Sequence, residues 1–376
     1  MPKSMNCICP GEARTERAEG PAFLKRFVFL CLLALGGFIG FAVYESVVLG
    51  LPPIREEPAL FTPYHLARSA FTLAMSLLIV RAVSSGRAAG SALMTADLRP
   101  SDRTWAVIAM LSALLCTVVL VASPDEFGAL AQEDSLIEWA SAILLFAGSG
   151  LFAADLVRRL ANRRGVPWAG RVGIFLSAGF AILFFLVAME EISWMQRIIG
   201  YQTPADVAKI NWQHEFNLHN IQTDLSETLY YFGTGIFLIL LPLVAETAHH
   251  WLPVPLPDFV PGRAVVAVSA PVSIFNYGHW NLIPVQATAM ITLFVLLAYA
   301  ASDGRRGNGK ERLLFLFLAG GVAAGQGLVL AYGPAMPQIP NATEFKEFFI
   351  ALGLAWFAFG AVERSSQPPK QVSARC

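Results

Sequence analysis

The chain has 376 residues and no net formal charge, and 55% of its residues are apolar while only 14% are charged. Soluble domains carry about 25% charged residues, so this composition, with a mean hydropathy of +0.55, excludes an ordinary soluble protein. The sequence has no basic face or aromatic-basic module, which argues against a nucleic-acid partner. Apolar segments of 18 or more residues recur, and they predict an all-α, polytopic bundle of transmembrane helices.

Taken in chain order, the apolar segments define the domain organisation. We predict a flexible cytoplasmic N-terminus over 1–26, a single transmembrane domain over 27–363 and a cytoplasmic tail over 364–376. The first apolar segment is too long for the core of a signal peptide, which spans about 7–15 residues. Residues 264–275 form a shorter apolar segment, interrupted by Pro271, that is either a short crossing or a re-entrant segment. Nine long helices are expected, at 27–48, 66–83, 104–122, 136–156, 171–189, 226–245, 283–301, 312–332 and 346–362.

Basic residues are distributed unevenly among the connections between these helices. They gather in three connections, at 87–103, 158–171 and 305–312. By contrast, 123–135 holds no Lys or Arg and the long connection 190–225 holds two, so the positive-inside rule places both outside. For 303–312 to lie inside as well, the chain must cross twice over 264–301. We therefore predict ten spans with both termini in the cytoplasm.

Many polar residues on the outer connections have a local explanation. The positive end of a helix dipole favours anions, and side-chain oxygens at a helix start cap its free N–H groups. Residues of this kind are Glu133, Asp134, Asp224, Glu227, Asn341 and Glu344. Glu138 and Glu347 lie deeper in their helices and are less easily explained in this way.

Glu190 and Glu191 differ from these acids, because they stand at the C-terminal end of a predicted helix, where the dipole disfavours negative charge. Glu190, Trp194 and Arg197 fall at i, i+4 and i+7, so Arg197 is expected to pair with Glu190 on one helical face. The alternative is an interfacial helix turn that Trp194 and Arg197 anchor among the lipid headgroups. Ionisable residues at membrane depth more often mark a functional site.

The rest of the connection 190–225 is predicted to form an interfacial segment on the outer face. Gly200 ends a helix, and Thr203 followed by Pro204 starts another. If 208–221 is helical, one polar stripe faces away from the membrane and consists of Asn211, Glu215, His219 and Gln222.

Within that stripe, Glu215 and His219 at i, i+4 form half of a metal site or an acid–base dyad. The segment reads HExxxH rather than HExxH, which places His214 and His219 on different faces and excludes a zincin site. His279, in the outer stretch NYGHWN, is a further histidine that can reach this site.

These two stretches, EEISWMQRIIGYQTP and NWQHEFNLHN, resemble a group of uncharacterised bacterial multi-pass membrane proteins that carry EE-x-SW-x-QR and E-x-NLHN segments. Such proteins often have Gly after the Trp, where this chain has Met195. The resemblance implies a shared polar site and a bacterial cytoplasmic (inner) membrane location, without naming a chemistry. The residues that carry it are Glu190, Glu191, Ser193, Trp194, Gln196, Arg197, Thr203, Pro204, Glu215, Asn217, Leu218, His219 and Asn220.

Three function classes are compatible with these residues. The first is a hydrolase or transferase that acts at the outer leaflet on membrane lipid or a lipid-linked substrate, with Glu190, Glu191 and His219 as catalytic residues. The residues expected to bind substrate are Trp194, Gln196, Arg197, Asn217 and Asn220. The expected ligands of a divalent metal are Glu215, His219 and His279. The alternatives are a non-catalytic assembly or partner protein, and a transporter.

Overall fold

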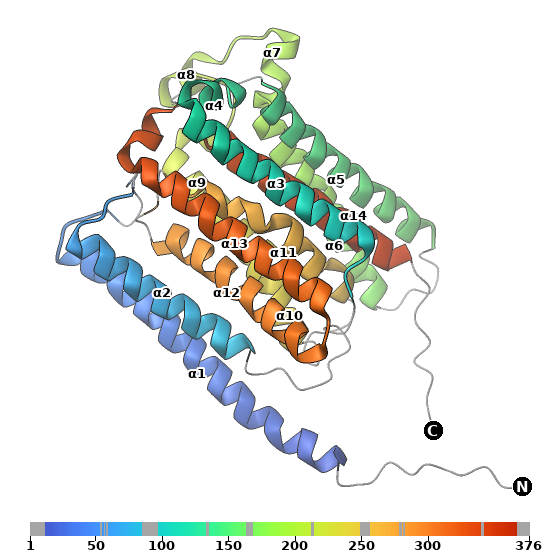
Figure 1. Ribbon diagram of the computed structural model, residues 1–376. Helices are drawn as coiled ribbons and strands as arrows, with labels where there is room; N and C mark the ends of the chain where they lie inside the picture. The colour runs from blue at the N-terminus through green and yellow to red at the C-terminus, as the bar shows by residue number, and fades with distance from the viewer. Residues whose placement is uncertain are drawn as a thin grey trace, which may run out of the picture.

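The computed structural model (Figure 1) describes residues 12–52, 55, 57, 59–84, 97–132, 135–162, 168–211, 214–248, 256–277, 280, 283–339 and 342–366. Over these residues the chain is helical and contains no strand. The α-helices are α1 (Glu12–Val47), α2 (Pro63–Ser84), α3 (Pro100–Ala122), α4 (Pro124–Leu130), α5 (Leu136–Ala161), α6 (Trp168–Glu191), α7 (Gln196–Ile199), α8 (Ala205–Ile210), α9 (Thr223–Gly235), α10 (Leu241–Ala248), α11 (Arg263–Ser269), α12 (Ile283–Arg306), α13 (Gly309–Tyr332) and α14 (Glu344–Ser366). The 3₁₀ and π turns are η2 (Ser193–Met195), η3 (His219–Ile221), η4 (Ile236–Leu240), η5 (Leu256–Phe259), η6 (Ala270–Phe275) and η7 (Gly333–Gln338).

The nine long helices expected from the apolar segments are confirmed. Among the described residues, nine helices are long and apolar enough to cross a membrane, so the chain is a multi-pass integral membrane protein. α1 begins at Glu12, inside the segment 1–26 that we expected to be flexible. Its Ala, Glu and Arg residues favour helix, so the helix extends ahead of the apolar part, which begins at Lys25.

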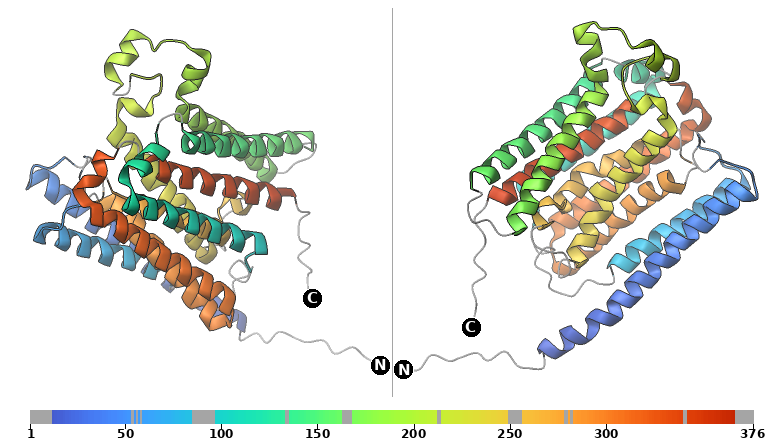
Figure 2. Two further views of the ribbon diagram at one scale, coloured as in Figure 1. Left: turned by 45° about the horizontal axis from the view of Figure 1, so that its top comes forward. Right: turned by 180° about the vertical axis from the view of Figure 1, so that it is seen from behind.

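The bundle has two ends that differ in chemistry (Figure 1). At the basic end, α2, α5 and α12 finish with Arg81, Arg158, Arg159, Arg305 and Arg306. At the carboxylate end, α5, α9 and α14 begin with Glu138, Asp224, Glu344 and Glu347. The short helices α4, α7 and α8 also lie at the carboxylate end (Figures 1 and 2).

The short apolar segment 264–275 runs through the middle of the bundle. All residues from Val265 to Phe275 are buried, and α11 and η6 pack against α3, α13 and α14. The α-helix gives way to the 3₁₀ turn η6 beside Pro271, because proline cannot donate the next helical hydrogen bond. Arg263 and Asp303 join the start of this segment to the end of α12 at the basic end. Phe275, at the other end of the segment, stacks on Phe345 near the start of α14 at the carboxylate end, so the chain passes between the two ends here as well. This passage agrees with a crossing rather than a re-entrant segment.

Acids at the basic end are paired with arginines. Asp155 accepts hydrogen bonds from Arg159 Nε at 2.6 Å and from two serines and Arg158. Arg263 Nη2 lies 2.5 Å from Asp303 Oδ2 and 3.1 Å from Glu311 Oε2. The negative charges of these carboxylates are therefore balanced by arginine side chains.

An aromatic core joins α5, α6 and α14 on the way to the carboxylate end. Phe152 stacks on Phe180 with ring centroids 5.0 Å apart, and Phe237 meets Phe357 edge-on at 4.9 Å. Gly148 lets α5 approach α6 closely, because a Cβ there would lie 2.5 Å from the ring of Phe184. Such ring pairs contribute about 0.5–1.5 kcal/mol each beyond their buried area.

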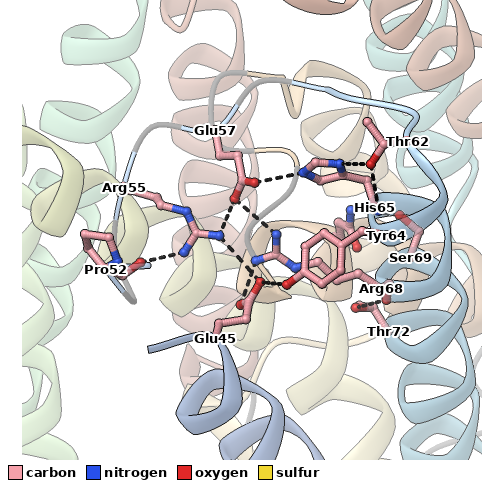
Figure 3. Close-up of polar contacts among 11 residues, drawn as sticks. Glu45, Pro52, Arg55, Glu57, Thr62, Tyr64, His65, Arg68, Ser69 and Thr72 are labelled. Atoms are coloured by element: carbon pink, nitrogen blue, oxygen red, sulfur yellow. Dashed lines mark hydrogen bonds and ion pairs between the residues drawn. The ribbon is translucent and has the colours of Figure 1, made fainter. Parts of the chain in front are cut away.

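The α1–α2 hairpin is attached at the edge of the bundle, where α2 packs against α12 (Figure 2). A buried ionic network closes its tip (Figure 3). Arg68, 1% exposed, donates to Glu45 Oε2 at 2.9 Å and to Glu57 Oε2 at 3.1 Å. Arg55 and His65 contact Glu57 as well, at 2.5 and 3.0 Å. The tip is therefore held by two glutamates that share one buried arginine.

We expect Arg68→Met to destabilise the hairpin strongly. The change leaves Glu45 and Glu57 without their buried partner, and breaking a buried ion pair costs about 3–5 kcal/mol. The midpoint of thermal unfolding of the purified protein should fall, and protease should cut more readily between α1 and α2. Arg81→Met, an exposed position at the other end of the same helix, is the matched control. Equal midpoints for the two variants would contradict a stabilising role for the network.

Candidate functional site

The two adjacent carboxylates at the end of α6 have different partners. Glu190 accepts hydrogen bonds from Trp194 Nε1 at 2.7 Å and from the backbone N–H groups of Leu218 and His219 at 2.6 and 3.2 Å. His219 Nδ1 lies 3.3 Å from the same Glu190 oxygen. Glu191 instead faces the start of α14. Consecutive helical residues point about 100° apart. Glu190 therefore binds the connection 192–222, which we call the outer segment after the side predicted for it, while Glu191 faces the bundle.

A left-handed turn follows α6 immediately. Ser193, Trp194 and Met195 have φ angles of 44°, 55° and 61°, a conformation that costs about 1–2 kcal/mol per residue for side chains larger than glycine. Trp194 and Met195 pack on Ala142 and neighbouring apolar residues, which holds the turn in place. Glycine at position 195 would adopt this positive φ without the cost.

The prediction of an amphipathic helix over 208–221 is wrong. α8 ends at Ile210, and Asn211 has an extended backbone. The Asn211 side chain donates to the backbone oxygen and to Oδ1 of Asn217 at 2.8 and 2.7 Å, which closes a loop in place of a helix. His214 lies in this loop with φ 59°. The loop removes the helical register on which the polar stripe depended.

Two expected pairings also fail. Arg197 pairs with Glu215 rather than with Glu190, because the left-handed turn reorients the chain after α6. Glu215 also accepts a hydrogen bond from Ser193, whose hydroxyl accepts one from Asn217 at 3.0 Å. Glu215 is therefore held by Arg197 and Ser193, and the metal half-site with His219 is not formed as a helical pair.

The other predicted substrate-binding residues help to hold the same segment. Gln196 Nε2 donates to Thr203 Oγ1 at 2.7 Å, and its Oε1 accepts from the backbone N–H of Phe216 at 2.7 Å. Asn220 is buried. His279 lies outside the described residues. Contact of these residues with a substrate stays a prediction.

A cluster of three carboxylates lies where α6 meets α14. Glu191, Glu344 and Glu347 each place one carboxylate oxygen within 4.8 Å of the other two. Glu344 and Glu347 stand at i, i+3 in the first turn of α14, so they share a face. The hydroxyl of Tyr231, on α9, donates to Glu347 Oε1 at 2.7 Å. We call these three glutamates the carboxylate cluster.

A buried lysine accompanies the cluster. Lys346 is only 4% exposed, and its Nζ lies 3.7 Å from the centre of the Tyr231 ring, in cation–π contact. Glu227 interacts electrostatically with both Lys346 and Glu347, and Glu138 with Glu191. From sequence, Glu227 and Glu344 are expected to be caps, and nothing in the pattern distinguishes Lys346 or the tyrosines. The signal that pointed toward the cluster was the depth of Glu138 and Glu347 in their helices.

A small polar cavity adjoins the site from within the bundle. It is bordered by the π-helical turn η4 and the 3₁₀ turn η6, and irregular turns of this kind recur at functional sites. Two of its lining atoms, Asn276 Oδ1 and Ser269 Oγ, are buried and have no hydrogen-bond partner within the described part of the chain. The polar residues that line it are Tyr231, Thr234, Ser269, Ser273, Asn276, Thr288 and Lys346.

The pKa values of His219 and Tyr277, which lie outside the membrane-spanning helices, are shifted. Burial acts to lower the pKa of His219, but the contact with Glu190 and the negative charge of Glu347 outweigh it and raise the pKa. Burial raises the pKa of Tyr277 well above its ordinary value, and the charge of Glu227 acts in the same direction. Tyr277 therefore remains a neutral hydrogen-bond donor, and His219 favours its cationic form beside Glu190.

The His219–Glu190 contact should make stability depend on pH. Because the folded-state pKa of His219 is raised, its contribution is fully present below the unfolded value of about 6.5 and is lost as pH rises through the folded value. The difference in thermal midpoint between the wild type and His219→Gln should be largest near pH 5.5 and shrink toward pH 8.5. A difference that grows with pH would contradict this account.

Comparisons of this chain with protein-family models, with curated proteins and with solved structures found no match.

Proposed function

We propose that this protein is a hydrolase or transferase that acts on a lipid or lipid-linked substrate at the outer face of a bacterial cytoplasmic membrane. The observation that carries the proposal is the carboxylate cluster, in which Glu191, Glu344 and Glu347 gather where apolar spans end. Ionisable groups at such a depth are costly and in most membrane proteins serve a function.

The cluster has the parts that acid–base chemistry needs. Hydrolysis or transfer requires a base that takes a proton from water or an acceptor hydroxyl, and a donor that protonates the leaving group. Glu347 is oriented by Tyr231 and is suited to the role of base. Lys346, held on the ring of the same tyrosine, supplies positive charge for an anionic headgroup. Glu190 acts as a positioning residue, because its oxygens are occupied by the outer segment.

An apolar surface beside the cluster favours a lipid substrate. Several large apolar side chains of the segment that covers the site are exposed, as suits a surface lying in the boundary between lipid and water. They belong to α7, α8, the loop before η3 and the exposed face of α9. These residues are Ile198, Ile199, Ile210, Leu218, Leu225 and Leu229.

A transporter is the second candidate, and one observation favours it. The polar cavity beside Lys346 is bordered by two irregular turns within membrane-spanning segments, η4 and η6, and interrupted helices of this kind form the binding sites of transporters. Transport predicts movement of a solute across vesicles that hold the purified protein, without a change in lipid composition.

Glu347→Gln should abolish turnover if the protein is a lipid-processing enzyme. We expect cells that express the wild type to accumulate a lipid product that mass spectrometry of total lipids detects. Cells with equal amounts of Glu347→Gln should lack it, because loss of a general base slows reaction by about 10²–10⁴-fold.

Glu126→Gln, an exposed acid on α4 at the same end, is the matched control and should form product normally. Identical lipid profiles for the wild type, Glu347→Gln and cells without the protein would contradict an enzyme of this class.

A further inference from the structure

We propose that Glu191, Glu344 and Glu347 bind one divalent cation of the hard, oxygen-preferring class, such as Mg²⁺, Mn²⁺ or Ca²⁺. The inference rests on the function proposed above, because it supplies the cofactor of the same site. Glu347 would then hold the ion as a ligand, and the ion would lower the pKa of the attacking water in place of a free base. It replaces the metal ligands expected from the sequence, of which Glu215 is held by Arg197 and Ser193.

The spacing of the three oxygens suits a single ion. Hard divalent cations bind carboxylate oxygens at about 2.0–2.6 Å, so two ligands of one ion lie at most about 5 Å apart. The three oxygens lie within 4.8 Å of one another. The hydrogen bond from Tyr231 occupies Oε1 of Glu347 and leaves Oε2 open to a ligand.

Two members of the cluster, Glu191 and Glu347, lack an ion pair within the described residues, and the charges of Lys346 and His219 act on Glu347 only without an ion-pair contact. Lys346 is turned onto the ring of Tyr231, and no ion pair joins it to a described carboxylate. The C-terminal end of α6 adds the negative end of a helix dipole beside Glu191. Half-buried like charges in this arrangement favour binding of a cation.

A tyrosine hydroxyl gives independent support for a ligand. The hydroxyl oxygen of Tyr230 is buried and has no hydrogen-bond partner among the described residues. The carboxylates whose charges act on it are Glu191, Glu347 and Glu344, the three members of the cluster. An unpaired buried hydroxyl destabilises the folded protein. A water molecule on a bound cation would donate a hydrogen bond to the Tyr230 hydroxyl and so supply the partner that it lacks.

Binding of Mn²⁺ to the full-length protein tests the proposal without any activity assay. The protein is purified in detergent, stripped with EDTA and titrated with Mn²⁺ while electron paramagnetic resonance follows the free ion. We expect one bound Mn²⁺ per chain, displaced by Mg²⁺ or Ca²⁺. Glu191→Gln and Glu347→Gln should each weaken binding at least about tenfold, because each removes one charged ligand.

Two controls separate the cluster from other acids at the same end. Glu126→Gln removes an exposed acid, and Glu215→Gln removes the ligand expected from sequence alone; both should bind Mn²⁺ as the wild type does. In EDTA, Glu191→Gln and Glu347→Gln should unfold at the wild-type temperature or above it, because each removes a repelling charge from the empty site. This result would show that weaker binding does not come from misfolding.

The proposal is overturned if the wild type binds no Mn²⁺, or if the Gln variants of the cluster bind it as tightly as the wild type. Its failure is distinguishable from failure of the proposed function. If lipid product depends on Glu347 but no Mn²⁺ binds, the proposed enzyme stands and the cation site is rejected. If Mn²⁺ binds stoichiometrically but no lipid product forms, the cation site stands and the proposed enzyme is rejected.

Discussion

The carboxylate of Glu190 is the contact on which the geometry of the carboxylate end depends. Its oxygens accept from the indole of Trp194 and from backbone N–H groups of Leu218 and His219, which lie 28 and 29 residues further along the chain. Backbone groups near the edge of a membrane need such partners, because little water is available to replace them. The outer segment is thereby fixed over the end of α6, and Glu191 is left to face α14.

The left-handed turn after α6 is strained, and the contacts that it makes possible offset the strain. Three residues with positive φ cost about 3–6 kcal/mol together, taking about 1–2 kcal/mol for each. The turn brings Trp194 back to Glu190 and places the Ser193 hydroxyl against Asn217, so the contacts of the outer segment offset the cost. Strain held by surrounding structure in this way is typical of functional sites.

Sequence patterns predicted the spans of this fold better than they predicted its site. Apolar length alone locates the nine long helices, and Gly200 ends α7 with a positive φ because glycine suits that position. Helical periodicity failed between Asn211 and His219, because side-chain bonds to the backbone compete with helix there and leave no mark in the hydrophobic pattern. Glu344 was assigned as a cap because caps and site residues use the same side chains at helix starts. Only tertiary packing of α6 on α14 tells them apart.

The two ends of the bundle provide an internal comparison for the meaning of buried acids. At the basic end, Asp155 and Asp303 are each held by arginine, and ion pairs of this kind join helices. At the carboxylate end, Glu191 and Glu347 lie in a cluster of like charge without a basic partner among the described residues. A fold that had only to pack its helices would gain nothing from such a cluster, since an unpaired buried charge is strongly destabilising. Glu57 and Glu215 are also paired with arginine, whereas Glu191 and Glu347 have no such partner among the described residues, so the cluster is better explained by a ligand than by packing.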